Sequence, residues 1–272
     1  MGKRIMVAVI FVPLIILMLF FAPSWVLPVV VSGLAMIALH EVLWSTGFVK
    51  NPKISGLAIV LAGLIPFWVF VGERMLPALV TLFLYVVLLF AVAMKSHYTV
   101  TMEKMGGSFF LSIVIPYFLS TFIRIREMPD WRYYILLPFV VAWLSDAFAL
   151  FAGMAFGKHK LAPELSPKKT VEGAVGGLLG SILCCLIYGA VMQFGFGLGV
   201  SYLRFALYGA LGSLVSQLGD LSFSYIKRQY GLKDFGNIFP GHGGVLDRFD
   251  SVIFCAPFIE ILIHWLPAIW EV

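Results

Sequence analysis

Three aspartates near the ends of two apolar segments have the chemistry to hold a divalent cation: Asp220, Asp247 and Asp250. Asp247 and Asp250 are three residues apart and therefore lie on one face of a helix. If the helix that carries Asp220 is their neighbour, the three carboxylates form an oxygen-rich site, and a bound cation would relieve their repulsion. Oxygen ligands without cysteine suit Mg²⁺ better than Zn²⁺. The spacing therefore predicts a magnesium site.

Basic residues accompany these acids. Lys227 and Arg228 follow Asp220 along the same apolar segment, Lys233 lies in the connection that follows, and Arg248 stands beside Asp247. A divalent ion held by carboxylates, with Lys and Arg alongside, is typical of sites that bind phosphate groups. We therefore expect a phosphorylated ligand.

A polar stripe runs along the helix that carries Asp220. Its members follow one another at helical spacing, so they share one face: Ser213, Ser216, Gln217, Asp220, Ser224 and Lys227. Ser and Gln on such a stripe commonly form hydrogen bonds between membrane helices, which is the structural alternative. The aspartate indicates a further role.

A glycine-rich turn, "FPGHGG", connects the two acid-bearing segments. Gly241, Gly243 and Gly244 permit a tight turn and let backbone N–H groups approach an anion closely. Such turns are common, and its place between the aspartates is what favours a functional interpretation. His242 lies inside the turn and either donates a hydrogen bond to a phosphate or braces the loop.

A second polar segment, "GKHKLAPELSPKKTVEGAVGG", spans residues 157–177 and contains four lysines. It reads as a loop that ends at a helix start, with Ser166 or Thr170 as the N-cap and Glu172 in the first turn. Lys168 and Lys169 are candidate phosphate ligands, although positive charge is also ordinary beside a membrane. Asp146 on the preceding helix is followed by small residues on one face, which permit close helix packing.

Buried acids need a reason in a chain of this composition. Hydrophobic residues make up 61% of the sequence and charged residues only 12%, which predicts a polytopic membrane protein. A charge near the bilayer centre costs on the order of 3 kcal/mol. Five carboxylates nevertheless lie at or near the predicted cytoplasmic ends of apolar segments: Asp146, Glu172, Asp220, Asp247 and Asp250.

The apolar segments predict an all-α helix bundle with about nine transmembrane helices. The expected spans lie near residues 5–21, 25–45, 55–71, 76–94, 107–123, 134–156, 172–194, 201–226 and 250–270. We expect an N-terminal scaffold for lipid access over residues 1–130 and a catalytic region over residues 131–272, because the candidate site residues all fall in the second part.

The distribution of Lys and Arg predicts the orientation. Most of the nineteen fall before the first span or after even-numbered spans, which places the N-terminus in the cytoplasm and the C-terminus outside. Arg124, Arg126 and Arg132 form the one discordant connection. The segment "HEVLW" at residues 40–44 lacks the second His of a zinc-protease motif, and the three cysteines fall inside apolar spans, where we expect inert thiols.

The segment "SYIKRQYGLKDFGNIFPGHGGVLDRFD", residues 224–250, resembles the signature of the CDP-diacylglycerol synthase (phosphatidate cytidylyltransferase) family. The segment "SDAFALFAGMAFGKHKLAPELSPKKTVEG", residues 145–173, is similar to the other polar region of that family. One position departs from the pattern: the family commonly has an acid where this chain has Phe223. That difference puts the ligand list in question, and Asp250 is a candidate to compensate.

The resemblance implies that CTP and phosphatidic acid react to give CDP-diacylglycerol and pyrophosphate with Mg²⁺. Asp220 and Asp247 would hold Mg²⁺, with a second cation as an option, and Asp250 would complete or orient the shell; with Lys227 they form the expected catalytic group. The substrates would contact the remaining candidates: Asp146, Ser166, Lys168, Lys169, Thr170, Glu172, Ser224, Arg228, Lys233, His242, Gly243, Gly244 and Arg248.

The same resemblance implies a bacterial-type inner-membrane enzyme whose active site faces the cytoplasm. Its expected partners are the two substrates and membrane lipids, with no nucleic acid, and a homodimer is compatible with such a bundle. Two alternatives stay open: a CTP-dependent lipid kinase of the polyprenol-kinase kind, and an ion-coupled transporter. The transporter would spread its acids toward the midplane of two related halves, whereas the catalytic candidates here all lie in the C-terminal half, on one side of the membrane.

Overall fold

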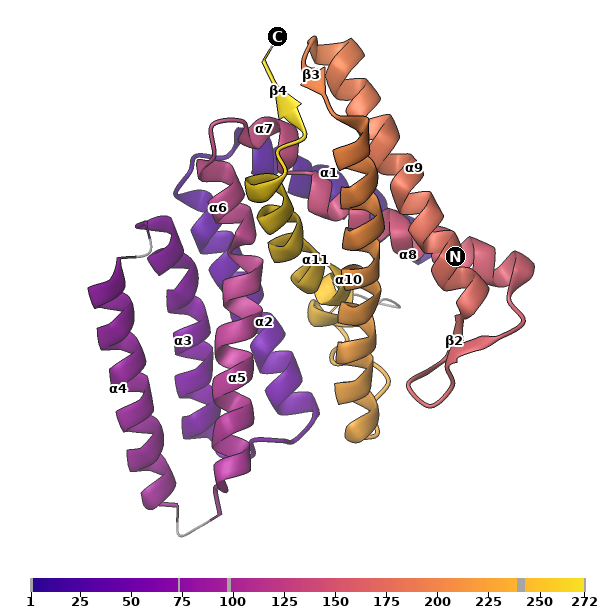
Figure 1. Cartoon of the computed structure of the whole chain (residues 1–272). Coiled ribbons are helices and arrows are strands. Elements are labelled where there is room, and N and C mark those ends of the chain that lie inside the picture. Colours follow the sequence, from indigo (N-terminus) through magenta and orange to yellow (C-terminus); the bar gives the residue numbers. More distant parts are fainter. Residues whose placement is uncertain (1, 73, 97–98, 239–242, 272) are drawn as a thin grey trace. The chain divides into compact units, whose positions relative to one another are not determined.

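The computed structural model describes residues 2–72, 74–96, 99–238 and 243–271, with residues 2–10 described for their backbone only (Figure 1). Contacts within the chain divide it into two compact units. Unit 1 comprises Met1–Arg124 and Tyr230–Arg248, and unit 2 comprises Ile125–Gln229 and Phe249–Val272. The chain therefore leaves unit 1, builds most of unit 2, and returns to unit 1 for the glycine-rich connection.

Unit 1 is a bundle of long apolar helices. They are α1 (Gly2–Phe21), α2 (Val26–Ser45), α3 (Pro52–Phe70), α4 (Met75–Met94) and α5 (Met102–Leu119), followed by the short α6 (Thr121–Glu127), which crosses the boundary of the units. α3 packs against α2, α4 and α5 (Figure 1). Asn51 and Thr101 cap α3 and α5, because each side chain accepts a hydrogen bond from a first-turn N–H.

Unit 2 contains the short α7 (Trp131–Tyr134) and the long helices α8 (Leu137–Phe156), α9 (Val171–Phe196) and α10 (Tyr202–Gln229). α11 (Leu246–Trp265) begins in unit 1 and continues in unit 2. Two small antiparallel pairs complete it. β1 (Lys160–Ala162) pairs with β2 (Ser166–Thr170), and β3 (Gly199–Val200) pairs with β4 (Ile269–Trp270).

Glycines bring α8 and α9 into close contact. A Cβ atom at Gly177 would lie 2.8 Å from the main-chain oxygen of Ser145, and one at Gly176 would lie 2.2 Å from the Cβ of Ala152. Gly153 of α8 in turn lies against Gly173 of α9. The small residues predicted to permit close approach therefore form the α8–α9 interface.

The all-helical class is confirmed, and each of the nine predicted spans overlaps one long helix. Six helical segments of the described chain are long and apolar enough to cross a membrane: Val26–Ser45, Pro52–Phe70, Met75–Met94, Met102–Glu127, Trp131–Phe156 and Val171–Phe196. α10 and α11 are as long as these but carry the polar residues of the candidate site, which lowers their apolar content. These six segments indicate that the chain is an integral membrane protein.

Two details of the helices differ from the predictions. The fifth span ends at Leu119, and a separate short helix, α6, continues the predicted range. The lysine-rich connection, predicted as a loop, contains the β1–β2 hairpin. Backbone pairing within the hairpin satisfies hydrogen-bonding groups that a loop would leave to water.

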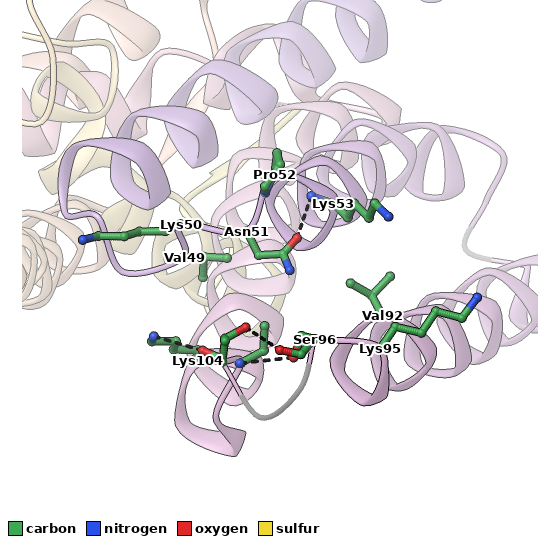
Figure 2. Close-up of a pocket in the computed structure, with 11 residues that line it drawn as sticks. Val49, Lys50, Asn51, Pro52, Lys53, Val92, Lys95, Ser96 and Lys104 are labelled. Atoms are coloured by element: carbon green, nitrogen blue, oxygen red, sulfur yellow. Dashed lines mark hydrogen bonds between the residues drawn. The ribbon is translucent and has the colours of Figure 1, made fainter.

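A cavity of about 580 Å³ lies at one end of unit 1, between the α2–α3 and α4–α5 connections (Figure 2). Lys50, Lys53, Lys95 and Lys104 line it together with Asn51 and Ser96. Figure 2 shows the ammonium groups of Lys50, Lys53 and Lys95 extending away from the enclosed space. Lysines at helix ends on one side of a membrane are an ordinary consequence of topology, and none of the predicted site residues lies here.

Candidate active site

Asp220 on α10 pairs with a lysine from the hairpin. The Nζ atom of Lys169 on β2 lies 2.5 Å from Oδ2 of Asp220. Ser224, one turn further along α10, donates a hydrogen bond of 3.3 Å to Oδ1 of the same carboxylate. The sequence singled out both Asp220 and Lys169, and the structure joins them in one charge pair within unit 2.

A second charge pair joins α10 to α11. Nζ of Lys227 lies 3.8 Å from Oδ2 of Asp250, and both residues are buried, with exposed fractions of 7% and 9%. The backbone N–H of Ser251 donates to Oδ1 of Asp250 at 2.8 Å. Burial strengthens the attraction between the charges and raises the cost of leaving either one alone.

Three acids from three helices gather around these pairs. The charge on Asp250 interacts with those on Asp220 and Asp146, so α8, α10 and α11 each contribute one carboxylate to the same region of unit 2. Lys169 and Lys227 each pair with one of these carboxylates. The predicted convergence of acids from separate helices is thus present for Asp146, Asp220 and Asp250.

The hairpin places the predicted nucleotide ligands on one strand. Ser166, Lys168, Lys169 and Thr170 all belong to β2. Of the two predicted N-caps it is Thr170 that caps α9, because its Oγ1 accepts the Gly173 N–H at 3.0 Å. Arg228 of α10 donates to the main-chain oxygen of Leu165 at 3.0 Å, which ties the hairpin to the end of α10.

Glu172 holds the entry to the hairpin. Its carboxylate accepts hydrogen bonds from the backbone N–H groups of Lys158 and His159 at 3.1–3.3 Å, and Oε1 lies 2.6 Å from Nδ1 of His159. The backbone N–H of Val171 donates to the His159 carbonyl at 2.9 Å. These contacts close the base of the hairpin and give Glu172 a structural part in shaping the region.

The upper part of the polar stripe joins helices. Ser213 and Ser145 of α8 share a hydrogen bond of 2.7 Å, and Gln217 donates to Ser213 and to the main-chain oxygen of Ala174 on α9. The hydrogen-bonding alternative therefore holds for Ser213 and Gln217. Asp220, Ser224 and Lys227, further along the helix, belong to the charged cluster.

Asp247 binds described backbone on both sides of residues 239–242 in unit 1. Its Oδ2 accepts the N–H groups of Phe235 at 2.8 Å and of Gly244 at 3.0 Å. Gly243 has a φ of +84°, and a Cβ there would lie 2.8 Å from the same oxygen, so this position requires glycine. Lys233 and Arg248 are exposed. The prediction for His242 falls outside the described residues.

Glu41 of α2 is a buried acid to which sequence reasoning gave no role. Oε1 accepts the Val245 N–H and Oε2 accepts the Leu246 N–H, each at 2.9 Å, and the residue is only 5% exposed. Val245 and Leu246 stand where α11 begins, so Glu41 takes the place of an N-cap side chain. Its signal was an acid inside an apolar span, within the "HEVLW" segment.

Comparison with known proteins identifies the family of the chain. Residues 2–266 match the model of the Cytidylyltransferase family, which is nearly the whole chain. This chain belongs to the cytidylyltransferase family. This chain is 36% identical over 241 residues to the phosphatidate cytidylyltransferase of Bacillus subtilis, a match that covers 86% of this chain and 87% of the relative.

Two further relatives are also named phosphatidate cytidylyltransferase. The phosphatidate cytidylyltransferase of Staphylococcus haemolyticus is 36% identical over 237 residues, covering 85% of this chain and 86% of the relative. That of Staphylococcus aureus strain COL is 36% identical over 250 residues, covering 88% and 90%. The matches extend over both units, so the likeness is not confined to the polar motifs.

Phe223 of this cytidylyltransferase, at the position expected to be acidic, lies in an apolar contact. It is 3% exposed and packs edge-to-face against Phe254 of α11, with ring centroids 6.0 Å apart. The aromatic pair thus joins α10 to α11 one turn from Asp220 and Asp250. Phe223 therefore contributes to packing between α10 and α11.

The donor chemistry of the cytidylyltransferase fits a hard cation. Carboxylate and hydroxyl oxygens line the region, and the free cysteines Cys185 and Cys255 are buried in α9 and α11. Within the described residues, no three His, Cys, Asp or Glu side chains are arranged to hold a metal. Asp220 and Asp250 face lysines instead, so binding a cation requires these side chains to move.

Proposed function

We propose that this protein is a CTP:phosphatidate cytidylyltransferase of phospholipid biosynthesis. It transfers the cytidylyl group of CTP to phosphatidic acid and releases CDP-diacylglycerol and pyrophosphate. Family membership and three relatives named phosphatidate cytidylyltransferase support the activity. The active site is assigned to one cluster of charged side chains because this cluster combines three carboxylates with two lysines. Its members are Asp146, Asp220, Asp250, Lys169 and Lys227.

The reaction needs alignment and charge neutralisation. An oxygen of the lipid phosphate forms a bond to the α-phosphorus of CTP, the bond from that phosphorus to the β-phosphate bridging oxygen breaks, and the electron pair leaves with pyrophosphate. The lipid phosphate is already an anion at neutral pH, so no general base has to remove a proton. Catalysis then rests on holding two anions in line and stabilising the charge that passes to the leaving group.

The lysines of the cluster supply that stabilisation. Lys169, with Ser166, Lys168 and Thr170 on the same strand, faces the nucleotide, and Lys227 with Arg228, Lys233 and Arg248 neutralises the lipid phosphate and pyrophosphate. In the structure, Lys169 forms an ion pair with Asp220, and Lys227 forms one with Asp250. An incoming phosphate competes for these ammonium groups and leaves the carboxylates to a cation. Asp146 and Glu172 shape the pocket, the backbone at Gly243 and Gly244 approaches a phosphate, and His242 either donates a hydrogen bond to a phosphate or braces the turn.

Mg²⁺ is the cofactor of this proposal. Asp220, Asp247 and Asp250 are the residues that would hold it, with Asp250 completing or orienting the shell and a second cation as an option. When bound, the ion neutralises phosphate charge and fixes the orientation of CTP. The lysines and the backbone N–H groups of the glycine turn contribute the rest of the positive potential.

The topology of the proposal has nine spans, with α1–α5 and α8–α11 crossing the membrane and the N-terminus in the cytoplasm. Retention of Lys and Arg on the cytoplasmic side supports this orientation. The β1–β2 hairpin and the glycine-rich connection then meet cytoplasmic CTP, while phosphatidic acid arrives from the inner leaflet of a bacterial inner membrane. A homodimer is the proposed assembly.

The activity is tested with purified protein, labelled CTP and phosphatidic acid in detergent. We expect a CTP-derived lipid and pyrophosphate only when a divalent cation is present, and loss of at least 99% of turnover in Asp220→Asn and Asp247→Asn, because electrostatic contributions of this kind are worth about 10²–10³ in rate. Release of CDP in place of pyrophosphate would identify a lipid kinase. Ion flux in liposomes without lipid turnover would identify a transporter.

A further inference from the structure

The described end of the connection between α10 and α11 contacts an acid that lies 204 residues earlier in the chain than Val245. The two oxygens of Glu41 accept the N–H groups of Val245 and Leu246, each at 2.9 Å. These donors stand at the beginning of α11, where N–H groups have no partner inside the helix and the helix dipole favours a negative charge. A carboxylate is the side chain best suited to both requirements.

Two glycines of the connection lie in close contact with the Glu41 carboxylate. A Cβ atom at Gly236 would lie 2.5 Å from Oε1 of Glu41, and one at Gly244 would lie 2.4 Å from either oxygen. Both ends of the connection therefore press against one carboxylate. Ser45, one turn further along α2, donates a hydrogen bond to the main-chain oxygen of Phe235 and fixes the same segment from a second point.

The turn fixed in this way also holds Asp247. The N–H groups of Phe235 and Gly244 both donate to Oδ2 of Asp247, at 2.8 and 3.0 Å. Within the described part of the connection, the backbone N–H groups of residues 244–246 each donate to one of these two acids, the first to Asp247 and the next two to Glu41. Movement of the Glu41 carboxylate would release the donors next to the one that orients Asp247.

We propose that Glu41 is the positioning residue of the active site, through two backbone hydrogen bonds that fix the start of α11 and hence the Asp247 carboxylate. The effect of Glu41 on catalysis depends on the proposed function. The geometry of its contacts lies within unit 1 and does not depend on that proposal. Glu41 contacts neither reacting atom in this assignment. Its effect reaches the chemistry through the orientation of a predicted magnesium ligand, and such supporting contacts typically change metal affinity or activity by 10- to 100-fold.

The first test measures the turn itself, without substrate or metal. Hydrogen–deuterium exchange is followed in the full-length protein in detergent with chelator present. In Glu41→Ala we expect faster exchange in the peptide covering residues 235–247 and unchanged exchange in α9. Glu41→Gln should exchange almost as fast, because its amide group presents N–H to one of the two donors. Glu41→Asp should fall between Glu41→Ala and the parent protein, because it keeps the carboxylate on a shorter stem.

The second test separates positioning from general stability. We expect Glu41→Ala to raise the Mg²⁺ concentration for half-maximal activity at least tenfold, and Glu41→Asp to recover part of this shift. Glu103→Ala, which removes an exposed acid of α5, should leave it unchanged. A loss of maximal rate with no shift in the Mg²⁺ requirement would overturn the proposal, as would unchanged exchange at residues 235–247. If the parent protein makes no CDP-diacylglycerol, the proposed function fails, and the exchange experiment still decides the role of Glu41.

Discussion

At the residue scale, the charged side chains of the site are satisfied by one another. Lys227 and Asp250 are both buried and lie 3.8 Å apart, and the exposed fraction of each is below one tenth. Such a pair contributes little net stability relative to apolar residues, but the removal of one partner leaves a buried charge uncompensated. The effect of this pair on stability can therefore be measured separately from its proposed part in catalysis.

A double-mutant experiment makes that separation. Lys227→Met should lower the free energy of unfolding by about 3 kcal/mol, because the Asp250 carboxylate loses a buried counter-charge. Lys227→Met combined with Asp250→Asn should recover most of that loss, since neither side chain is then charged. Both the single and the double variant should lack cytidylyl transfer.

Thermal unfolding in detergent and the CTP assay, run on the same preparations, check both halves of this prediction. If the double variant is as unstable as Lys227→Met, then Lys227 stabilises the helices through packing of its stem and not through its charge. If the double variant is active, the charge pair is not part of the catalytic group.

At the element scale, α9 is the helix on which the polar hairpin is built. Its N-terminus is capped by Thr170, and its glycines lie against α8. A methyl group added at Gly177 would meet the main-chain oxygen of Ser145 at 2.8 Å and the Cβ of Ala149 at 3.0 Å. A main-chain atom inside a helix cannot give way as a flexible side chain can, so the two helices would have to separate.

A matched pair of alanine substitutions tests this interface. Gly177→Ala should destabilise the protein by about 1–3 kcal/mol, the usual cost of overpacking. Gly195→Ala on the same helix would place its methyl group 3.9 Å from the side chain of Val191, and should be neutral or slightly stabilising, because alanine favours helix.

Thermal unfolding of the two variants under identical detergent conditions gives the comparison. Gly177→Ala should also lower turnover, because α8 carries Asp146 and α9 follows directly from β2. Equal unfolding temperatures for the two variants would show that the α8–α9 contact tolerates the extra volume.

At the scale of the whole molecule, the orientation in the membrane decides which substrate reaches which side. The proposed topology places the hairpin between α8 and α9 in the cytoplasm and the end of the chain outside. Glu164 of the hairpin and Glu271 near the C-terminus are both exposed, so each can report on its own side.

Cysteine labelling in intact cells measures this orientation. Cys184, Cys185 and Cys255 are first replaced by alanine, and then Glu164→Cys or Glu271→Cys is introduced. A membrane-impermeant maleimide should label Glu271→Cys in intact cells and Glu164→Cys only after permeabilisation. The reverse pattern would invert the topology, and labelling of both positions from one side would require an even number of spans between them.

Much of this protein was predictable from local patterns. Apolar runs of about 20 residues specify membrane helices because a bilayer leaves the backbone no other hydrogen-bonding partner. Helical spacing placed Asp220, Ser224 and Lys227 on one face, and small residues predicted the α8–α9 contact; the structure contains both. The residues of the two polar segments predicted a phosphate-binding site, because carboxylates that can hold a divalent cation stand beside lysines and arginines.

Only the tertiary structure decided the partner of each charged group. Lys169 pairs with Asp220 because the β1–β2 hairpin folds toward α10, and a loop of the same composition does not imply that contact. Glu41 had no role in its own segment, since its partners are backbone N–H groups that become available only where α11 begins. Periodicity fixes which face of a helix is polar, whereas the partner met by that face depends on packing between segments far apart in the chain.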